Sequence, residues 1–291
     1  MTDTLPELSR HLSSLVERLS SPVVAVLSGS GAASGFVWRD GHVVTAEEAL
    51  AADDGIVVAL GDGRRLPAVL VGRDASTDVA LLRVEEPLPP AVPLDAAAPR
   101  RVGELALAIG RGRDGTTSAL GMVGTVGPAW RSLRGGRIDA RLGLDLRLPR
   151  HAQGGLAVDA EGRAFGMTVL GPRRSTLAIP AATIDRVAAQ LLAHGRVPRG
   201  YLGLSLQPLR VDGSGERGAL VLGVEAAGPG QNAGLRQGDI IVRFAGEPLG
   251  GPRPITDRLG PETVGQTVEL GILRGGEHQT IALVIGERPA A

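Results

Sequence analysis

Short apolar runs broken by turns dominate the chain between residues 23 and 179. Asp40-Gly41 and Asp62-Gly63 are typical turn pairs, and a proline-rich stretch occupies residues 87–99. The clearest apolar runs are 56–60, 68–71, 79–84 and 105–109. Because no helical period is sustained here, the pattern predicts antiparallel strands closed into barrels. The proline-rich stretch is expected to lead into the join between two such barrels.

Helical spacing of apolar residues appears at two places, and both predict amphipathic helices. The first helix is predicted within residues 1–20, and the second within 180–194, where Gly195 follows as a helix stop. The apolar positions of the first are Leu5, Leu8, Leu12, Leu15, Val16 and Leu19. This helix is expected to dock on its own barrel or, alternatively, on a neighbouring subunit.

The last third of the chain has a pattern of its own. An apolar strand is predicted over 218–224, and two closing strands over 268–274 and 280–285. Segment 196–200 is a short linker. The domain organisation is therefore predicted as an N-terminal helix (1–20), a double barrel (21–195), the linker (196–200) and a small C-terminal domain (201–288).

Three stretches of the barrel region carry a family resemblance. Val43-Val44-Thr45-Ala46-Glu47-Glu48-Ala49-Leu50 resembles a strand-to-helix turn that normally ends in a histidine, and Thr77-Asp78-Val79-Ala80 resembles T-D-L-A. His151-Ala152-Gln153-Gly154-Gly155 stands where G-x-S-G-G is usual. In this order and spacing they resemble the HtrA-type (DegP-like) serine proteases, in which a trypsin-like domain precedes a PDZ domain.

The C-terminal domain carries the second half of the resemblance. Residues 231–241, QNAGLRQGDII, are similar to the PDZ stretch S-P-A-A-x-A-G-L-x-x-G-D-x-I, and 242–249 resemble the hairpin that follows it. The resemblance implies a mainly β protein: a trypsin-like double β-barrel, then a small α/β PDZ domain, with the amphipathic helix in front.

By this resemblance, the catalytic triad positions are occupied by Glu48, Asp78 and Gln153, so only the aspartate is retained. Serine proteolysis needs a nucleophile and a base, and neither an amide nor a carboxylate at these places supplies that pair. His151 replaces the glycine that helps to form the oxyanion hole. The resemblance therefore implies a pseudoprotease, with Asp78 retained to cap its turn.

Glu48 and Asp78 leave a second interpretation open. Two carboxylates that share a site push one pKa upward, which is typical of an acid/base pair. The structural alternative is that Glu48 turns to solvent or pairs with an arginine such as Arg150. Gln153 is a further candidate to donate a hydrogen bond to Asp78 or Glu48.

The PDZ groove is the best surviving functional site implied by the resemblance. A peptide C-terminus adds as a strand to the edge of such a domain, and backbone N–H groups of the opening loop hold its carboxylate. By resemblance, the residues of the opening loop, the edge strand and the helical wall are Tyr201, Leu202, Gly203, Leu204, Ser205, Leu206, Ile255 and Leu259. The alternative is a PDZ domain used only for packing.

Composition excludes several classes of function. A formal net charge of zero argues against nucleic acid as a partner. With no Cys, no Lys and five scattered His, the chain offers no thiolate metal site, Walker A loop or Schiff-base lysine. We therefore expect no cofactor and no metal.

The first twenty residues resemble neither a signal peptide nor a membrane span, which favours a cytoplasmic location, with the periplasm as the alternative. The expected function is a binding, regulatory or chaperone-like module for peptide or protein C-termini, in homo-oligomers or mixed oligomers with active relatives. Two alternatives remain. One is an enzyme, either a residual serine endopeptidase or a carboxylate-based hydrolase. The other is a purely structural subunit.

Overall fold

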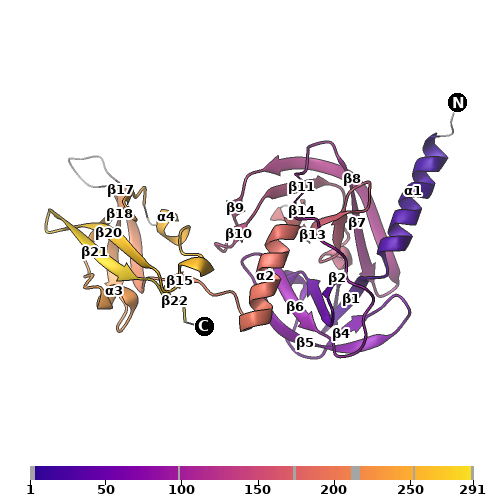
Figure 1. The fold of residues 1–291 in the computed structure, drawn as a ribbon, viewed down its shortest axis with the longest axis horizontal. Coiled ribbons are helices and arrows are strands. Elements are labelled where there is room, and N and C mark those ends of the chain that lie inside the picture. Colours follow the sequence, from indigo (N-terminus) through magenta and orange to yellow (C-terminus); the bar gives the residue numbers. More distant parts are fainter. Residues whose placement is uncertain (1–3, 98, 173–174, 211–216, 252, 290–291) are drawn as a thin grey trace. The chain divides into compact units, whose positions relative to one another are not determined.

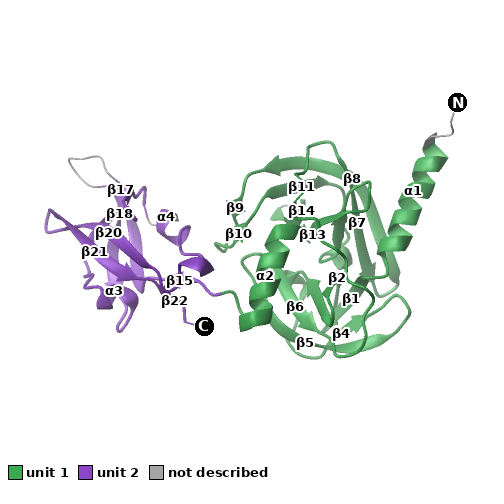
Figure 2. Cartoon of the chain, in the orientation of Figure 1, with its two compact units in different colours: residues 1–197 green, residues 198–291 purple. Residues whose placement is uncertain are grey.

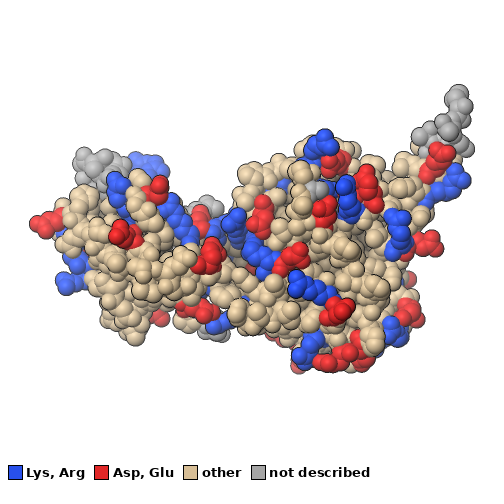
Figure 3. All heavy atoms as spheres, viewed as in Figure 1, with Lys and Arg blue, Asp and Glu red and all other residues tan. Residues whose placement is uncertain are grey.

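The structure is a computed structural model that describes residues 4–97, 99–172, 175–210, 217–251 and 253–289. By its internal contacts the chain separates into two compact units, residues 1–197 and 198–291 (Figure 2). On the face that Figure 3 shows, acidic and basic side chains are interspersed over the described surface of each unit. This mixture agrees with the zero net charge.

The described residues of the first unit form two closed barrels of six strands each (Figure 1). The first barrel runs in the order β1-β2-β3-β6-β5-β4 and the second in the order β11-β14-β13-β12-β7-β8. The strands of the first are β1 (Val23–Ser28), β2 (Gly31–Arg39), β3 (His42–Thr45), β4 (Ile56–Ala59), β5 (Arg65–Asp74) and β6 (Val79–Arg83). Those of the second are β7 (Leu105–Gly112), β8 (Gly115–Gly127), β11 (Arg141–Asp145), β12 (Leu156–Val158), β13 (Ala164–Leu170) and β14 (Thr176–Pro180).

Shorter elements decorate the barrels. A two-stranded hairpin, β9 (Trp130–Arg131) and β10 (Arg137–Ile138), projects between β8 and β11. Two 3-10 turns, η1 (Glu47–Ala49) and η2 (Arg150–Ala152), follow β3 and β11. Helix α2 (Ala181–His194) follows the second barrel and ends at Gly195, whose φ of 69° closes the last turn through an N–H donated to Leu191 O.

The core of the first unit is aliphatic, as the low aromatic content requires. One cluster of buried side chains joins both barrels with α2 and the N-terminal helix, and includes Leu15, Leu81, Leu156 and Ile184. Helix α1 (Thr4–Leu19) buries Leu15, whereas Leu5 and Leu8 near its start stay exposed. The predicted amphipathic helix is therefore present and packs on its own barrel through its second half.

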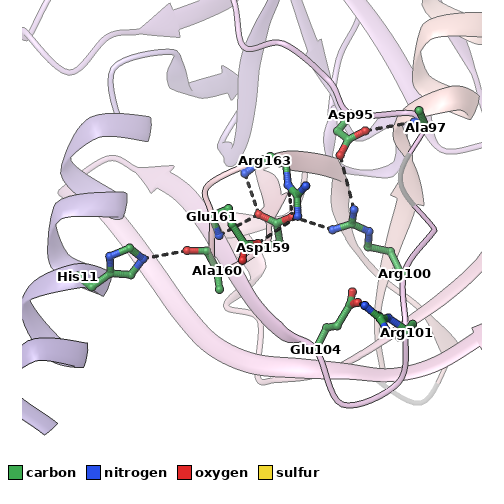
Figure 4. Close-up of polar contacts among 10 residues, drawn as sticks. All are labelled: His11, Asp95, Ala97, Arg100, Arg101, Glu104, Asp159, Ala160, Glu161 and Arg163. Atoms are coloured by element: carbon green, nitrogen blue, oxygen red, sulfur yellow. Dashed lines mark hydrogen bonds and ion pairs between the residues drawn. The ribbon is translucent and has the colours of Figure 1, made fainter. Parts of the chain in front are cut away.

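A polar network fixes α1 and the proline-rich segment to the second barrel (Figure 4). Buried Arg100 donates to Asp159 Oδ2 at 2.8 Å, and Arg163 reaches the same oxygen at 2.8 Å. His11 Nε2, on α1, lies 2.9 Å from the carbonyl oxygen of Ala160, the residue that follows Asp159. The two arginines and the backbone N–H of Arg163 hold the pKa of Asp159 below its usual range, although burial opposes them. A buried carboxylate that is paired in this way is stable only with its partners.

The second unit is built on a sheet in the order β16-β17-β18-β20-β21, with β19 beside β18. These strands are β16 (Leu204–Arg210), β17 (Arg217–Val224), β18 (Ile240–Phe244), β19 (Glu247–Pro248), β20 (Thr267–Arg274) and β21 (Glu277–Val284). A separate pair joins β15 (Gly200–Tyr201) to β22 (Gly286–Glu287). The helical pieces are α3 (Pro229–Asn232), α4 (Arg253–Thr256) and η4 (Pro261–Thr263).

The buried side chains of the second unit form a core of their own, which includes Leu202, Ile241, Ile255 and Leu270. Asp239 anchors one end of this sheet, because Arg274 donates to both of its carboxylate oxygens at 2.8 and 2.7 Å. The mainly β fold predicted from the sequence is confirmed: two barrels, then a PDZ-like sheet, with the N-terminal helix in front.

Candidate functional site

Glu48 and Asp78, two of the predicted site residues, are in direct contact. Asp78 Oδ1 accepts a hydrogen bond from the Glu48 N–H at 2.8 Å, and Asp78 O accepts one from the Glu47 N–H at 3.4 Å. Asp78 adopts a φ of 59°, a left-handed conformation that Asp and Asn tolerate better than most residues. The aspartate therefore caps η1 with both its side chain and its backbone.

Burial raises the pKa of Asp78 to about 7, and the charges of Glu48 and Glu47 add to this effect. The N–H groups donated by Glu48 and Glu47 oppose the rise without cancelling it. The sequence predicted an upward shift from the like charges alone, but desolvation is the larger cause. At neutral pH a substantial fraction of Asp78 is therefore a neutral acid.

Arg134, on the β9–β10 hairpin, reaches across to the same turn. Its guanidinium lies 3.6 Å from Glu47 Oε2 and 3.6 Å from Glu48 Oε1. Arg73 Nε lies 3.5 Å from Glu47 Oε1, the other oxygen of the same carboxylate. Glu48 is thus half exposed and paired with an arginine, as the structural alternative expected, but the arginine is Arg134 and not Arg150. Pairing with Arg134 opposes a role for Glu48 as a free base.

The hairpin that carries Arg134 is tied to the loop before Asp78. Ser132 Oγ donates to Ser76 O at 2.6 Å, and Arg134 donates to Ala75 O at 3.3 Å. Gly136 lies so close to Ser76 that an added Cβ would fall 2.4 Å from its carbonyl oxygen. The position of Arg134 over η1 is therefore fixed by several backbone contacts.

Gln153 follows η2 and is 8% exposed. Its carbonyl oxygen accepts a hydrogen bond from Ser34 N at 2.8 Å, which ties this turn to β2 of the first barrel. Its own N–H donates back to Arg150 O at 3.2 Å and closes the 3-10 turn. In a trypsin-like protease the N–H at the nucleophile position helps to hold the oxyanion. Here that N–H is already used within the turn.

Gly154 shows why the turn after Gln153 keeps its shape. Its φ is 89°, and an added Cβ would lie 2.2 Å from Ser34 O. Thr45 Oγ1 donates to the same Ser34 oxygen at 2.7 Å, and Thr45 leads directly into η1. Gln153 is therefore brought to the same region as Glu48 and Asp78. Among the described hydrogen bonds, none joins the Gln153 side chain to either carboxylate.

Ser34 is not a substitute nucleophile. It is fully buried, and its hydroxyl donates to His151 O at 2.7 Å and accepts from Arg111 N at 2.8 Å. Within the described residues, no group of three or more His, Asp or Glu side chains is arranged to hold a metal ion.

In the second unit, the predicted peptide loop has the features that a carboxylate would need. Gly203 adopts a φ of 67°, its carbonyl accepts from Glu225 N at 2.9 Å, and Leu202 O accepts from Gly230 N at 2.8 Å. The N–H groups of Leu202 and Gly203 donate to no other backbone group in the part of the chain that the structure describes. Both donors are thus left for a ligand or for water.

The remaining predicted groove residues divide into two sets. β16, with exposed Ser205 and half-buried Leu206, is the first strand in the order of the sheet and so presents an edge. Ile255, on the one-turn helix α4, is 1% exposed and belongs to the core. Leu259 lies after α4, and its carbonyl accepts a hydrogen bond from Gly200 N at 3.3 Å.

Comparisons with known proteins agree with this geometry. A family described as "Trypsin-like peptidase domain" matches residues 33–167, and "PDZ domain" matches residues 200–285. The serine endoprotease from Yersinia pestis is 28% identical, with a TM-score of 0.78 over 95% of this chain and 98% of that one. Over both of its units the chain is therefore similar to proteases of the HtrA/DegP type.

Other known proteins show the same similarity. The HtrA-type protease AlgW, solved with a decapeptide, is 25% identical with a TM-score of 0.79 over 96% of this chain and 99% of that one. Two proteins named "Probable periplasmic serine endoprotease DegP-like" are each 32% identical. The one from Rhizobium meliloti matches over 88% of this chain and 53% of its own, and the one from Hahella chejuensis over 99% and 63%. The chain spans a little more than half of these relatives.

These names contradict one expectation. The predicted cytoplasmic location is wrong, because the curated relatives are named periplasmic proteins. The expectation relied on the composition of the first twenty residues. Residues 4–19 form a helix that packs on the barrel. The composition of this segment therefore reflects its packing and carries no information about export. Among the helices of the described residues, none has the length and apolar character needed to cross a bilayer.

Sequence reasoning missed the side chains that surround the two carboxylates. Glu47, Arg73 and Arg134 form the ion pairs there, and Asp74 organises the loop before Asp78 by accepting from Ser76 Oγ and Thr77 Oγ1, both at 2.7 Å. Glu47 next to Glu48 was a visible signal, whereas Arg134 is 86 residues further along and only the fold brings it near.

Proposed function

We propose that this chain is an inactive member of the HtrA/DegP family that binds peptide or protein C-termini and does not cleave them. The observation that carries the proposal is Gln153, which ends η2 in a trypsin-like frame with its N–H bonded to Arg150 O. An amide cannot attack a peptide carbonyl, and a donor used inside the turn cannot stabilise an oxyanion.

The neighbouring groups support the same conclusion. Glu48 is a carboxylate paired with Arg134, so it does not replace an imidazole as the base. Asp78, with its pKa raised to about 7, caps η1 through its side-chain oxygen and backbone carbonyl. Asp78 thus has a structural role that accounts for its retention without catalysis.

The binding activity is proposed for the loop Tyr201–Leu204 and the edge of β16. The free N–H groups of Leu202 and Gly203 suit a terminal carboxylate, and an added strand satisfies the edge of β16 beside Ser205 and Leu206. Relatives solved with a decapeptide and a tripeptide add support for a peptide ligand. Through this groove the chain would act as a regulatory or chaperone-like partner, alone or in oligomers with active relatives.

Binding is tested by fluorescence anisotropy with a peptide of eight residues that ends in Val, compared with its C-terminal amide. The free acid is expected to bind, and the amide to bind at least about tenfold more weakly, because a charged hydrogen-bonded contact is lost. Equal binding of both peptides would contradict the groove proposal. The matched variant is Leu206→Pro, which removes the β16 N–H opposite Val221, whose own N–H and carbonyl bond to Asp239 and Gly238 and not to β16. Leu206→Ala, which shortens the same side chain and keeps the N–H, is its control.

Proteolysis is tested separately, by incubating the full chain with unfolded casein. No product is expected from the chain or from Gln153→Ala. Cleavage by the chain that is lost in Gln153→Ala would contradict the inactive assignment without touching the peptide-binding assignment.

One observation favours a second candidate function, hydrolysis by a pair of carboxylates. Asp78 as a neutral acid beside the Glu48 carboxylate is the arrangement of a carboxylate-based hydrolase. Hydrolysis of a chromogenic ester or glycoside that disappears in both Asp78→Asn and Glu48→Gln would support it.

A further inference from the structure

Pro208 lies within the edge strand that the proposed peptide groove uses. It is part of β16, two residues beyond Leu206, and its ring nitrogen carries no hydrogen. A proline is tolerated in a sheet at an edge, but it cannot donate a hydrogen bond to a strand that is added there. Its effect on the groove therefore depends on the side of β16 to which its nitrogen points.

The hydrogen bonds of β17 show which groups of β16 point outward. Val221 lies opposite Leu206 in the register of the two strands. The Val221 N–H donates to Asp239 O at 2.8 Å, and its carbonyl accepts from Gly238 N at 2.9 Å, so both groups are directed away from β16. In an antiparallel pair, bonded and non-bonded positions alternate, and the groups of a non-bonded residue turn to its other side. Leu206 accordingly presents its N–H and carbonyl to the free edge.

The same alternation places the nitrogen of Pro208 at the edge. Pro208 lies opposite Ala219, which is two residues before Val221 and is therefore directed to the same side as Val221, away from β16. A proline ring places a carbon where the amide hydrogen would be. This position of the edge thus offers no donor, and the ring holds an incoming carbonyl group away.

The start of β16 is arranged for the end of a peptide. Glu225 N donates to Gly203 O at 2.9 Å, so the groups of the next residue, Leu204, face the edge. Just before it, the N–H groups of Leu202 and Gly203 donate to no backbone group of the described residues and suit a terminal carboxylate. From this end, an added strand meets edge-facing groups at Leu204 and then at Leu206, and the third such position is the proline.

The side chains of β16 change character at the same place. Leu204 and Leu206 are half-buried and pack against the core of the second unit, whereas Pro208 is exposed. Side chains two residues apart share one face of a strand, so the apolar face runs from Leu204 to Leu206 and stops before the proline. The backbone groups and the apolar surface available to a peptide therefore both end after Leu206.

We propose that Pro208 limits recognition in this groove to the last three or four residues of a C-terminal peptide, an inference that rests on the peptide-binding function proposed above. The terminal residue bonds beside Leu204 and the third residue from the end bonds beside Leu206, because edge-facing positions are two residues apart on both strands. The fifth residue from the end would meet Pro208, finds no donor and leaves the edge. The ligand is thus a short C-terminal motif, and the residues upstream of it are not selected.

The test compares two acetylated peptides by calorimetry with the full chain: the tripeptide Leu-Ala-Val and a hexapeptide that adds Ser-Ala-Ser in front of it. Their dissociation constants are expected to agree within about twofold, because the added residues gain no bond. Pro208→Ala supplies the missing N–H. With this variant the hexapeptide should bind about three- to tenfold more tightly than the tripeptide, which is the range of one neutral hydrogen bond.

Gln207→Ala is the matched control. Gln207 is exposed on the same strand and lies between two edge-facing positions, so its N–H is directed to β17 and not to the peptide. The ratio of the two dissociation constants should therefore stay as in the parent chain. The tripeptide should bind Pro208→Ala as it binds the parent chain, which shows that the start of the groove is unchanged.

Hydrogen exchange of an isotope-labelled hexapeptide locates the limit directly. In the complex with the parent chain, the N–H of the third residue from its end should be protected and that of the fifth should exchange as in the free peptide, whereas Pro208→Ala should protect both. The length limit is overturned if the hexapeptide binds the parent chain more than about twofold more tightly than the tripeptide, or if Pro208→Ala brings no gain. If neither peptide binds the parent chain, the groove itself is refuted, and the limit with it.

Discussion

Replacing Asp78 by Asn should make the stability of the first unit less dependent on pH. Asn retains the oxygen that accepts the Glu48 N–H and tolerates the φ of 59°, so the cap on η1 is kept. What changes is the proton: the folded chain raises the pKa of Asp78 from its ordinary 3.8 to about 7. Between these values the folded state binds more protons than the unfolded state.

The sign follows from that proton balance. The favourable contribution of a protonated Asp78 is complete below pH 4 and is lost as the pH rises through 7. At about 1.4 kcal/mol for each tenfold change in proton affinity, the full loss is about 4 kcal/mol. Asp78→Asn removes this loss. Its free energy of unfolding, relative to the parent chain, should therefore increase by up to about 4 kcal/mol between pH 4 and pH 8.

Urea unfolding at pH 4 and pH 8 measures the change. Both tryptophans of the chain, Trp38 and Trp130, lie in the first unit, so their fluorescence reports on that unit alone. Exposed Asp54→Asn is the control and should show no such pH dependence. If Asp78→Asn is equally destabilising at both pH values, Asp78 is an ordinary ionised cap and the reasoning from burial is refuted.

Two further substitutions test which contacts stabilise the first unit. Both are measured by urea unfolding with the same tryptophan fluorescence. Gly154→Ala should destabilise the first unit by more than about 3 kcal/mol, because the added Cβ meets Ser34 O. Gly135→Ala is its control: Gly135 has a similar positive φ of 84°, but the space around it is open, so this substitution should cost about 1–2 kcal/mol. Arg100→Leu should cost about 2–3 kcal/mol, because buried Asp159 loses one of its two arginine partners and keeps Arg163. A change below about 1 kcal/mol would contradict the assigned role of the network.

The sequence predicted the fold well because local patterns and the resemblance agreed. Strand runs, Asp-Gly turns and the helix stop at Gly195 are local signals, and the structure has strands and a helix at those places. The candidate site was harder, since its surroundings come from distant segments. Arg134 reaches Glu48 only through the β9–β10 hairpin, and no pattern near Arg134 marks that contact.

Hydrogen bonds and burial were beyond sequence reasoning altogether. The turn that consumes the Gln153 N–H depends on the conformation of residues 150–153 and not on their identity alone. Likewise, Ile255 resembles a groove residue by its position, yet the short α4 places it in the core at 1% exposure. The location was predicted from the first twenty residues, of which 4–19 form a helix packed on the barrel.

The most direct test of the inactive assignment is labelling of the full chain by a fluorophosphonate, read by intact mass. We expect no adduct on the chain. We also expect at most a trace on the Gln153→Ser/Glu48→His double variant, because the N–H of residue 153 stays bonded to Arg150 O. Stoichiometric labelling of a serine in the unmodified chain would contradict the account and show that the nucleophile lies elsewhere.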